Sequence, residues 1–241
     1  MYKLVLFDLD GTLLPLDIEV FVKNYFVSIT DFFQDVVDPQ VFLHNLKQST
    51  RAMARNQGDT VNEEVFMKNF LPAVGRERDF MYPRFQLYYE KEFPKLKEYA
   101  GFSPWAQESV TEVLNKGYPI VLATNPLFPR MATVERMSWA RISQYPWSMI
   151  TTYENSRRCK PNVQYYQDIC RRMGVQAKEC LMIGNDVQED IVAGTLGMDT
   201  FLVTDHLIDR GNPSYHPGHQ GTLPELAHFM KEMPQYSPQG C

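Results

Sequence analysis

Two aspartates, Asp8 and Asp10, stand at the end of a short apolar run, residues 3–7, and are followed by Gly11 and Thr12. On a regular strand their side chains would share one face, and a glycine turn can swing the second carboxylate around the first. Two carboxylates buried close together are costly unless a cation or a proton is shared, and magnesium prefers such oxygen ligands. With the ion screening its charge, Asp8 could attack an electrophilic phosphorus, while Asp10 could protonate the leaving oxygen and later activate water. The competing interpretation is a loop whose Asp and Thr side chains cap a helix.

The elements that must position these aspartates have the pattern of strands buried on both faces. Three further apolar runs, each ending in polar residues, lie at 118–123, 180–183 and 200–203. Helix-like stretches with start and stop signals lie at 103–117, 161–174 and 186–197. This alternation predicts an α/β fold built on a doubly wound parallel sheet. Ligands of such sheets bind outside the carboxyl ends of the strands, so we expect the polar residues there to converge on one site.

The long segment after the first strand has a different pattern, with several amphipathic stretches in series and no convincing strand. Asp17 and Asp38 are predicted to be the N-caps of its first two helices, the second ending near residue 58. Thr60 and Glu63 have the spacing of a capping box that would open a third helix. Residues 77–93 are predicted to form the fourth.

The length of this segment predicts the domain organisation. A crossover between parallel strands needs only about a dozen residues, so we predict a helical domain at 16–99 inserted into a core formed by 1–15 and 100–241. The alternative is a set of extra helices packed on the sheet without independent motion. From residue 205 onwards we expect irregular structure except for a short helix at 223–230.

Four motifs occur in order along the chain: Phe-Asp-Leu-Asp-Gly-Thr at 7–12, an apolar run ending in Thr124, Lys-Pro at 160–161 before a helix, and an acidic stretch at 181–190. In order and spacing they resemble the four signatures of the haloacid dehalogenase superfamily of hydrolases. The resemblance covers the strand ends of the whole predicted core. It implies that residues 16–99 are the family's helical type of cap.

The resemblance implies a catalytic set made of Asp8, Asp10, Thr124 and Lys160. A phosphoryl group in transfer carries negative charge on its equatorial oxygens, so catalysis depends on positioning and electrostatic stabilisation. The Thr124 hydroxyl and the Asn125 backbone N–H can bind one such oxygen. Lys160 can neutralise another while it restrains Asp8. Alone, Thr124 would be a turn residue and Lys160 a surface charge, and the accompanying motifs favour the functional interpretation.

The fourth motif departs from the commonest form of the family, in which an Asp directly follows the glycine. Asn185 stands at that position, with Asp186 next and Asp190 four residues later. An amide is a weaker magnesium ligand than a carboxylate, so we expect Mg²⁺ to be held by Asp8, Asp10 and Asp186. Residue 10 would ligate through its backbone carbonyl, as the resemblance implies. Asn185 remains the alternative metal ligand, or else lies next to the ligands. Asp190 could bind a metal-bound water or orient Lys160.

We therefore predict a magnesium-dependent phosphatase that hydrolyses a small phosphomonoester through an aspartyl-phosphate on Asp8. Asp10 argues against the dehalogenase branch, which the resemblance implies lacks that acid and needs no magnesium. A phosphomutase or a phosphonate hydrolase remains an alternative, although no sequence context singles out Lys23, Lys47 or Lys68 as the cap lysine that the latter uses. A non-catalytic phosphate-binding regulatory module is the alternative of another class, and the intact catalytic residues count against it. A receiver domain is a further alternative, but its usual small size does not fit the long insertion at 16–99.

Substrate selectivity would be set by cap residues near the phosphate pocket. The aromatic candidates, which at helical spacing are more often core residues, are Phe21, Tyr25, Tyr82, Tyr88 and Tyr89. The candidates for binding a second anionic group, most of them expected in solvent, are Arg51, Arg55, Arg76, Arg78 and Arg84.

Composition limits partners and location. The 241-residue chain has a formal net charge of -5, which argues against general attraction to nucleic acid or to an anionic membrane. No apolar run approaches a transmembrane length, and the N-terminal run is too short for a signal peptide, so we expect a cytoplasmic protein. The cysteines, expected to be reduced thiols, are Cys159, Cys170, Cys180 and Cys241. The tail histidines, expected to be solvated loop residues, are His206, His216 and His219.

Overall fold

The computed structural model, which describes residues 2–237, contains a six-stranded, wholly parallel sheet, most of whose strands are short apolar runs. The strands, in the order β3-β2-β1-β4-β5-β6 across the sheet, are β1 (Leu4–Phe7), β2 (Ile120–Leu122), β3 (Met149–Ile150), β4 (Cys180–Gly184), β5 (Asp199–Val203) and β6 (His219–Gly221). The central strand β1 aligns Val5 with Ile120 of β2 and with Leu181 of β4. The motifs that follow β1, β2 and β4 therefore reach the same edge of the sheet.

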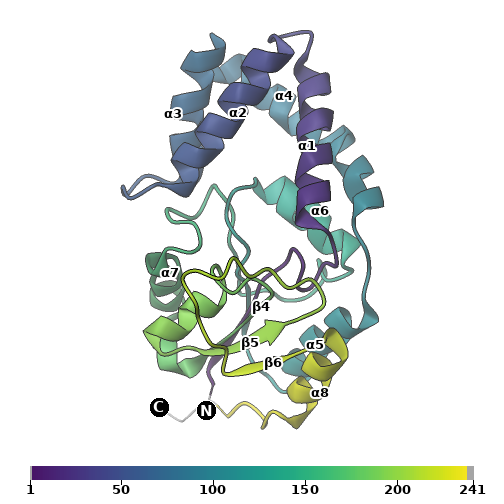
Figure 1. Ribbon diagram of the computed structural model, residues 1–241, viewed down its shortest axis with the longest axis vertical. Coiled ribbons are helices and arrows are strands. Elements are labelled where there is room, and N and C mark those ends of the chain that lie inside the picture. The colour runs from purple at the N-terminus through teal and green to yellow at the C-terminus, as the bar shows by residue number, and fades with distance from the viewer. Residues whose placement is uncertain (1, 238–241) are drawn as a thin grey trace.

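Both faces of the sheet are covered, because alternate residues of each strand point to opposite sides. Val5 and Phe7 belong to one hydrophobic cluster, and Leu4 and Leu6 belong to another. The first cluster includes residues of α5 (Pro104–Asn115) and α8 (Leu223–Glu232), and the second includes residues of α7 (Val163–Met173) and the 3₁₀ helix η3 (Ile191–Leu196). The predicted doubly wound α/β fold and the predicted C-terminal helix are confirmed (Figure 1).

Two local expectations for the core need correction. The stretch expected to be helical at 186–197 forms turns and the 3₁₀ helix η3, not an α-helix. The tail contributes the strand β6 in addition to α8, and a second short 3₁₀ helix, η2 (Ala177–Glu179), precedes β4. Backbone pairing with β5, which aligns Leu202 with Gln220, makes a strand of β6 although it carries no apolar run.

The inserted segment is helical, as predicted. Its elements are α1 (Ile18–Phe33), α2 (Pro39–Ala54), α3 (Asn62–Val74), α4 (Arg78–Lys91) and the 3₁₀ helix η1 (Phe93–Tyr99). These helices lie beyond the carboxyl ends of the strands, at the end of the molecule opposite the N-terminus (Figure 1). The chain enters and leaves the segment at one place, because Leu16 bridges Ala100 and the Gly101 N–H donates to the Pro15 carbonyl at 2.6 Å.

The predicted caps of α1 and α2 are confirmed. Asp17 Oδ1 accepts the backbone N–H groups of Glu19 and Val20, at 2.9 and 3.1 Å. Asp38 makes the equivalent pair of hydrogen bonds in front of α2. Each side chain thereby satisfies N–H groups that the first turn of a helix leaves unpaired.

The capping box expected at Thr60 is wrong. The N-cap residue of α3 is Val61, which makes no side-chain cap hydrogen bond. The core supplies the missing acceptors, because the Asn62 N–H donates to Ser156 O at 2.8 Å and the Glu63 N–H donates to Tyr153 O at 2.9 Å. A tertiary contact with the loop before Lys160 thus replaces the local cap.

An aromatic cluster joins the inserted helices to the core. It involves α6 (Arg130–Trp139), which the sequence analysis did not assign. The Trp139 ring stacks on Phe93 with 5.6 Å between centroids, and Phe128 lies 5.1 Å from Tyr25 and 6.5 Å from Phe21. Aromatic pairs of this kind contribute roughly 0.5–1.5 kcal/mol each beyond the area that they bury. The inserted segment therefore shares a hydrophobic interior with the core.

Within residues 2–237, no helix combines the length and the apolar character needed to cross a membrane. Cys159, Cys170 and Cys180 are free and buried, as expected for reduced thiols. Cys241 lies outside the described residues.

Candidate active site

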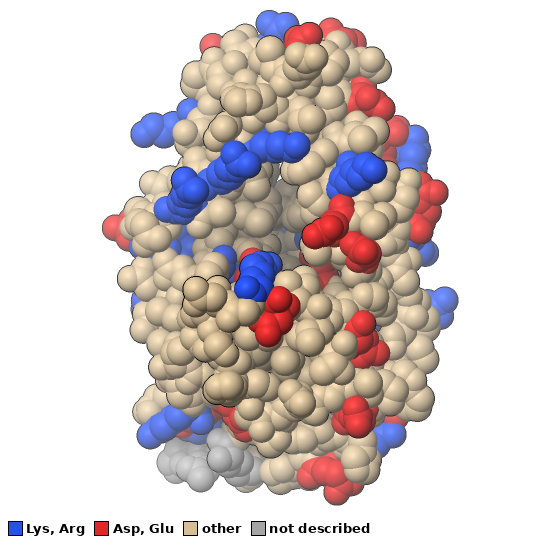
Figure 2. All heavy atoms as spheres, in the orientation of Figure 1, with Lys and Arg blue, Asp and Glu red and all other residues tan. Residues whose placement is uncertain are grey.

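A cleft of about 560 Å³ opens between the carboxyl edge of the sheet and the start of α1. Figure 2 shows it as a hollow between the upper and lower parts of the molecule, with acidic and basic side chains around the opening. The predicted site residues that line it are Asp8, Asp10, Thr124, Asn125, Asn185, Asp186 and Asp190. The structure thus brings together residues from three different strand ends.

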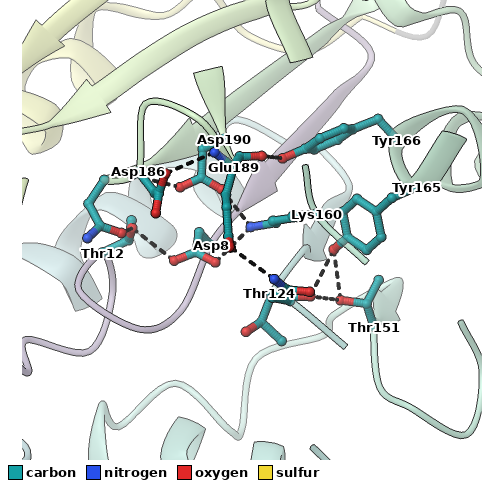
Figure 3. A network of polar contacts seen from close by, with 12 residues as sticks. Asp8, Thr12, Thr124, Thr151, Lys160, Tyr165, Tyr166, Asp186, Glu189 and Asp190 are labelled. Atoms are coloured by element: carbon teal, nitrogen blue, oxygen red, sulfur yellow. Dashed lines mark hydrogen bonds and ion pairs between the residues drawn. The ribbon is translucent and has the colours of Figure 1, made fainter. Parts of the chain in front are cut away.

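Lys160 lies at the base of this group and joins two of its carboxylates. Its Nζ atom is 2.8 Å from Asp8 Oδ1 and 2.6 Å from Asp190 Oδ1, and its side chain is 1% exposed (Figure 3). Burial alone would lower the pKa of Lys160, but the negative charges of Asp190 and Asp8 outweigh it and raise that pKa well above its usual value. The structure thus places Lys160 in direct contact with Asp8, the residue that it is expected to restrain.

Gly11 and Thr12 shape the turn that follows Asp8. Gly11 has a φ of +80°, and a Cβ atom there would lie 2.3 Å from Asn185 Nδ2, so only glycine fits. The Thr12 hydroxyl is within hydrogen-bonding distance of both Asp8 Oδ2, at 3.2 Å, and Asn185 Oδ1, at 2.9 Å. Asn185 Nδ2 in turn donates to the His206 carbonyl. Both ends of the Asn185 amide are thus occupied by protein groups.

Asp186 is bound through one of its two carboxylate oxygens. Asp186 Oδ1 accepts the backbone N–H groups of Gln188 and Glu189, both at 2.9 Å, and the Arg210 guanidinium at 2.8 Å. The Asp186 N–H donates to Asp190 Oδ2 at 3.0 Å. Asp186 therefore acts as a turn cap. Because Gln188, Glu189 and Arg210 all donate to Oδ1, this role leaves Oδ2 for a second function.

Thr124 and Asn125 lie across the cleft from this turn. Thr124 is buried, and its carbonyl accepts hydrogen bonds from the Thr151 hydroxyl at 2.7 Å and the Tyr165 hydroxyl at 2.9 Å (Figure 3). These bonds fix the backbone at the point where Thr124 meets the cleft. Asn125 Nδ2 donates to Glu189 Oε2 at 2.9 Å, which ties the second motif to the fourth.

Asp10 has a partner that sequence reasoning missed. Arg136, on α6, forms an ion pair with Asp10 Oδ2, and the Arg136 side chain is 1% exposed. Burial raises the pKa of the Asp10 carboxyl, although the positive charge of Arg136 opposes the rise. Glu189 and Arg210 were also missed. In a sequence these three residues resemble ordinary surface charges, and no motif marks them.

The oxygen-rich site fits a magnesium ion. Its carboxylates, Asp8, Asp10, Asp186, Glu189 and Asp190, outnumber the cations Lys160, Arg136 and Arg210 that contact this group. In the described part of the chain, no three His, Cys, Asp or Glu side chains are arranged together as metal ligands. Mg²⁺ needs fewer, because it usually keeps several waters and binds one or two carboxylates. The donor set and its excess negative charge are thus compatible with this ion.

The aromatic residues proposed for selectivity serve mainly as interior packing. Phe21, Tyr25, Tyr88 and Tyr89 are buried among the helices of the inserted segment. Apolar walls of the cleft come from other positions, namely Leu16, Ile18, Val22, Leu127 and Phe128. The core interpretation of the aromatic pattern is therefore confirmed for those four residues.

Several proposed arginines have protein partners outside the cleft. Arg78 pairs with Glu63 and Glu64, and Arg84 pairs with Asp35. Arg76 donates to the Val36 carbonyl, in the turn that follows α1. Among the described residues that line the cleft, none is one of the cap lysines considered, Lys23, Lys47 and Lys68.

Comparisons with known proteins agree with this geometry. The family model of haloacid dehalogenase-like hydrolases matches residues 2–195. The chain is 23% identical over 230 residues to the pyrimidine 5'-nucleotidase PynA of Streptococcus pneumoniae. The aligned region covers 89% of this chain and 90% of that protein. It is 26% identical over 107 residues to the glyceraldehyde 3-phosphate phosphatase of Methanothermobacter thermautotrophicus, covering 44% and 46% of the two chains.

A solved structure shows the same fold. The crystal structure of a HAD phosphatase from Thermococcus onnurineus superposes with a TM-score of 0.60 at 18% identity, covering 97% of this chain and all of that one (100%). The family match spans most of the chain and includes the ends of β1, β2 and β4, which carry the predicted site residues of the cleft. The chain therefore belongs to the haloacid dehalogenase-like hydrolases, and the protein is a hydrolase.

Proposed function

We propose that the protein is a magnesium-dependent phosphatase that hydrolyses a small phosphomonoester through a phosphoryl group carried on Asp8. The observation that carries the proposal is the buried Lys160, which bridges Asp8 and Asp190 beside Thr124 and Asp10. The names of the two relatives, a pyrimidine 5'-nucleotidase and a glyceraldehyde 3-phosphate phosphatase, support phosphate esters as substrates.

The chemistry assigns one task to each side chain. A carboxylate oxygen of Asp8 attacks phosphorus as the bond from phosphorus to the leaving oxygen breaks, and Asp10 gives that oxygen a proton. Asp10, now a carboxylate, then takes a proton from water, whose oxygen attacks phosphorus and releases Asp8 and inorganic phosphate. Lys160 and the Thr124 hydroxyl offset charge on the phosphoryl oxygens throughout. Asp8, Asp186 and the Asp10 carbonyl would hold Mg²⁺, which would supply further positive charge there.

We also propose that residues 16–99 act as a cap domain over a core made of 1–15 and 100–241. Support comes from the Leu16 to Ala100 bridge, where both connections lie side by side. Further support comes from the position of α1, which contributes one wall of the cleft through Ile18 and Val22. The apolar walls suit a leaving group with a hydrophobic face, such as a nucleoside.

A phosphate-release screen tests the proposed function. The purified full chain is assayed against nucleoside monophosphates, sugar phosphates and nitrophenyl phosphate, with Mg²⁺ or with a chelator. We expect phosphate release that requires Mg²⁺. Halide release from 2-haloacids without phosphate release from any ester would contradict the proposal and favour the dehalogenase branch.

Replacing Asp10 with asparagine is expected to lower kcat by about 10²- to 10⁴-fold, because the same carboxyl group is the acid and then the base. Mg²⁺ binding, measured by calorimetry, is expected to be retained better than activity, since the backbone carbonyl of residue 10 is unchanged. Unaltered turnover of an ester with a poor leaving group would contradict this role.

Asp186→Asn is expected to raise the Mg²⁺ concentration for half-maximal activity by at least about 100-fold, since even changes behind metal ligands cost about 10- to 100-fold. The amide oxygen can still accept the N–H groups of Gln188 and Glu189, so the turn is expected to fold. Asn185→Ala is the matched comparison, because both ends of its amide already bind protein groups. A severe Mg²⁺ defect in Asn185→Ala with a normal Asp186→Asn would assign the metal position to the amide.

A further inference from the structure

Arg136 is an arginine in the interior of the protein, and the catalytic scheme above gives it no task. Among the described residues it is the largest fully buried side chain, with 1% of its side chain exposed. A guanidinium cannot lose its charge, so burying it is costly unless its N–H groups are paired. The carboxylate that pairs with Arg136 belongs to Asp10.

Three contacts fix the orientation of this guanidinium. Its Nε atom donates to the Ala132 carbonyl at 3.3 Å, and Nη2 donates to the Thr133 hydroxyl at 3.5 Å, both within α6. The Phe128 ring lies under it, 4.5 Å from the guanidinium carbon to the ring centroid. These contacts leave Nη1 directed at Asp10 Oδ2. The planar guanidinium of Arg136 is held along one edge by α6 and on one face by the Phe128 ring, so it has little freedom to rotate.

The two oxygens of Asp10 are in different situations. Oδ2 is paired with Arg136, whereas Oδ1 is buried and has no hydrogen-bond partner among the described residues. Asp10 also lines the cleft beside Asp8. A buried polar atom without a partner in the free protein is an atom that a bound ligand can satisfy.

We propose that Arg136 is a positioning residue that holds Asp10 by Oδ2, so that Oδ1 presents the catalytic proton to the leaving oxygen. The proposal rests on the proposed phosphatase function. Phe128 also connects Arg136 to the inserted segment, because its ring packs on Phe21 and Tyr25 of α1. The orientation of the catalytic acid is thereby coupled to the docking of α1 on the core.

Arg136→Lys tests this role, because lysine keeps the charge and loses the rigid fork. The readout is kcat/KM for nitrophenyl phosphate and for an alkyl phosphate that the wild type hydrolyses, measured with Mg²⁺. This constant covers the steps up to phosphoryl transfer to Asp8 and excludes the later attack of water. A misplaced acid is expected to reduce kcat/KM for the alkyl phosphate by about 100-fold, because an error of about 1 Å in the position of a reacting group has an effect of that size. The nitrophenyl value is expected to change little, because that leaving group needs no proton.

Two controls separate positioning from a structural defect. Arg84→Lys alters an arginine paired with Asp35 in the inserted segment and is expected to change neither value. In an Asp10→Asn background, Arg136→Lys is expected to cause no further loss on the alkyl substrate, because the acid is already absent. Equal losses on both substrates, or a full additional loss in Asp10→Asn, would overturn the proposal.

A milder variant carries the test if Arg136→Lys does not fold. Thr133→Val removes the hydroxyl that accepts from Nη2 and is expected to reduce the alkyl value selectively, by a smaller factor. A loss of equal size on both substrates would again overturn the proposal. Wild-type phosphate release, and its loss in Asp8→Asn, report on the proposed function separately. If the wild type releases no phosphate from any ester, both proposals fail together.

Discussion

Asp8→Asn is expected to lower kcat by a factor on the order of 10⁶, the scale at which a hydrolase loses activity with its nucleophile. The amide is a poor nucleophile, but it has nearly the same shape and its oxygen can still accept from Lys160. Lys160 also keeps its ion pair with Asp190, so the folded structure is expected to persist. Phosphate release measures the loss of turnover, and circular dichroism with thermal unfolding measures the fold.

Asp38→Asn is the matched control for this substitution. Asp38 caps α2 and lies outside the cleft, and asparagine is an equally good N-cap residue. We expect wild-type activity from this variant. Substantial turnover by Asp8→Asn, at a rate near that of the control, would remove Asp8 from the role of nucleophile.

Lys160→Met is expected to lower the free energy of unfolding by about 3–5 kcal/mol, the cost of removing one partner of a buried ion pair. Lys160 compensates two carboxylates at once, and Asp190 is as buried as the lysine itself. Without the ammonium group, the charges of Asp8 and Asp190 would face each other in the interior. Urea unfolding monitored by circular dichroism measures the difference.

Two further variants show whether the loss comes from unpaired charge. Lys178→Met changes an exposed lysine and is expected to leave stability within about 0.5 kcal/mol of wild type, as for most surface substitutions. Adding Asp190→Asn to Lys160→Met removes one of the two buried charges that lysine no longer pairs, and is expected to restore part of the lost stability. Equal unfolding midpoints for Lys160→Met and Lys178→Met would contradict the compensating role of Lys160.

The arrangement of the candidate site residues could be predicted where one strand end carries one motif. An apolar run such as β1 leaves few alternatives to a buried strand, and parallel strands bring Asp8 and Thr124 to one edge. The caps Asp17 and Asp38 were equally predictable, because each acts on its own helix. These features depend on local sequence together with a general rule of α/β topology.

Features that depend on contacts distant in sequence were not predictable in this way. The start of α3 is fixed by carbonyls of Tyr153 and Ser156, which no local pattern around Thr60 reveals. The role of Arg136 was equally unpredictable, because its partner Asp10 lies 126 residues away in the sequence. A buried arginine and an exposed one have the same letter in a sequence, and only the fold distinguishes them.

The aromatic contacts between Phe93 and Trp139, and between Phe128 and Tyr25, limit how this protein could acquire a new specificity by exchange of parts. In sequence, residues 16–99 look like a module that could be transplanted. A foreign module without matching rings would leave Trp139 and Phe128 exposed to water, and each such ring buries about 150–250 Å² in a well-packed protein. Chimeras are therefore expected to need the donor's counterparts of these two core residues as well. Gradual substitution along the walls of the cleft is the easier evolutionary route to a different leaving group.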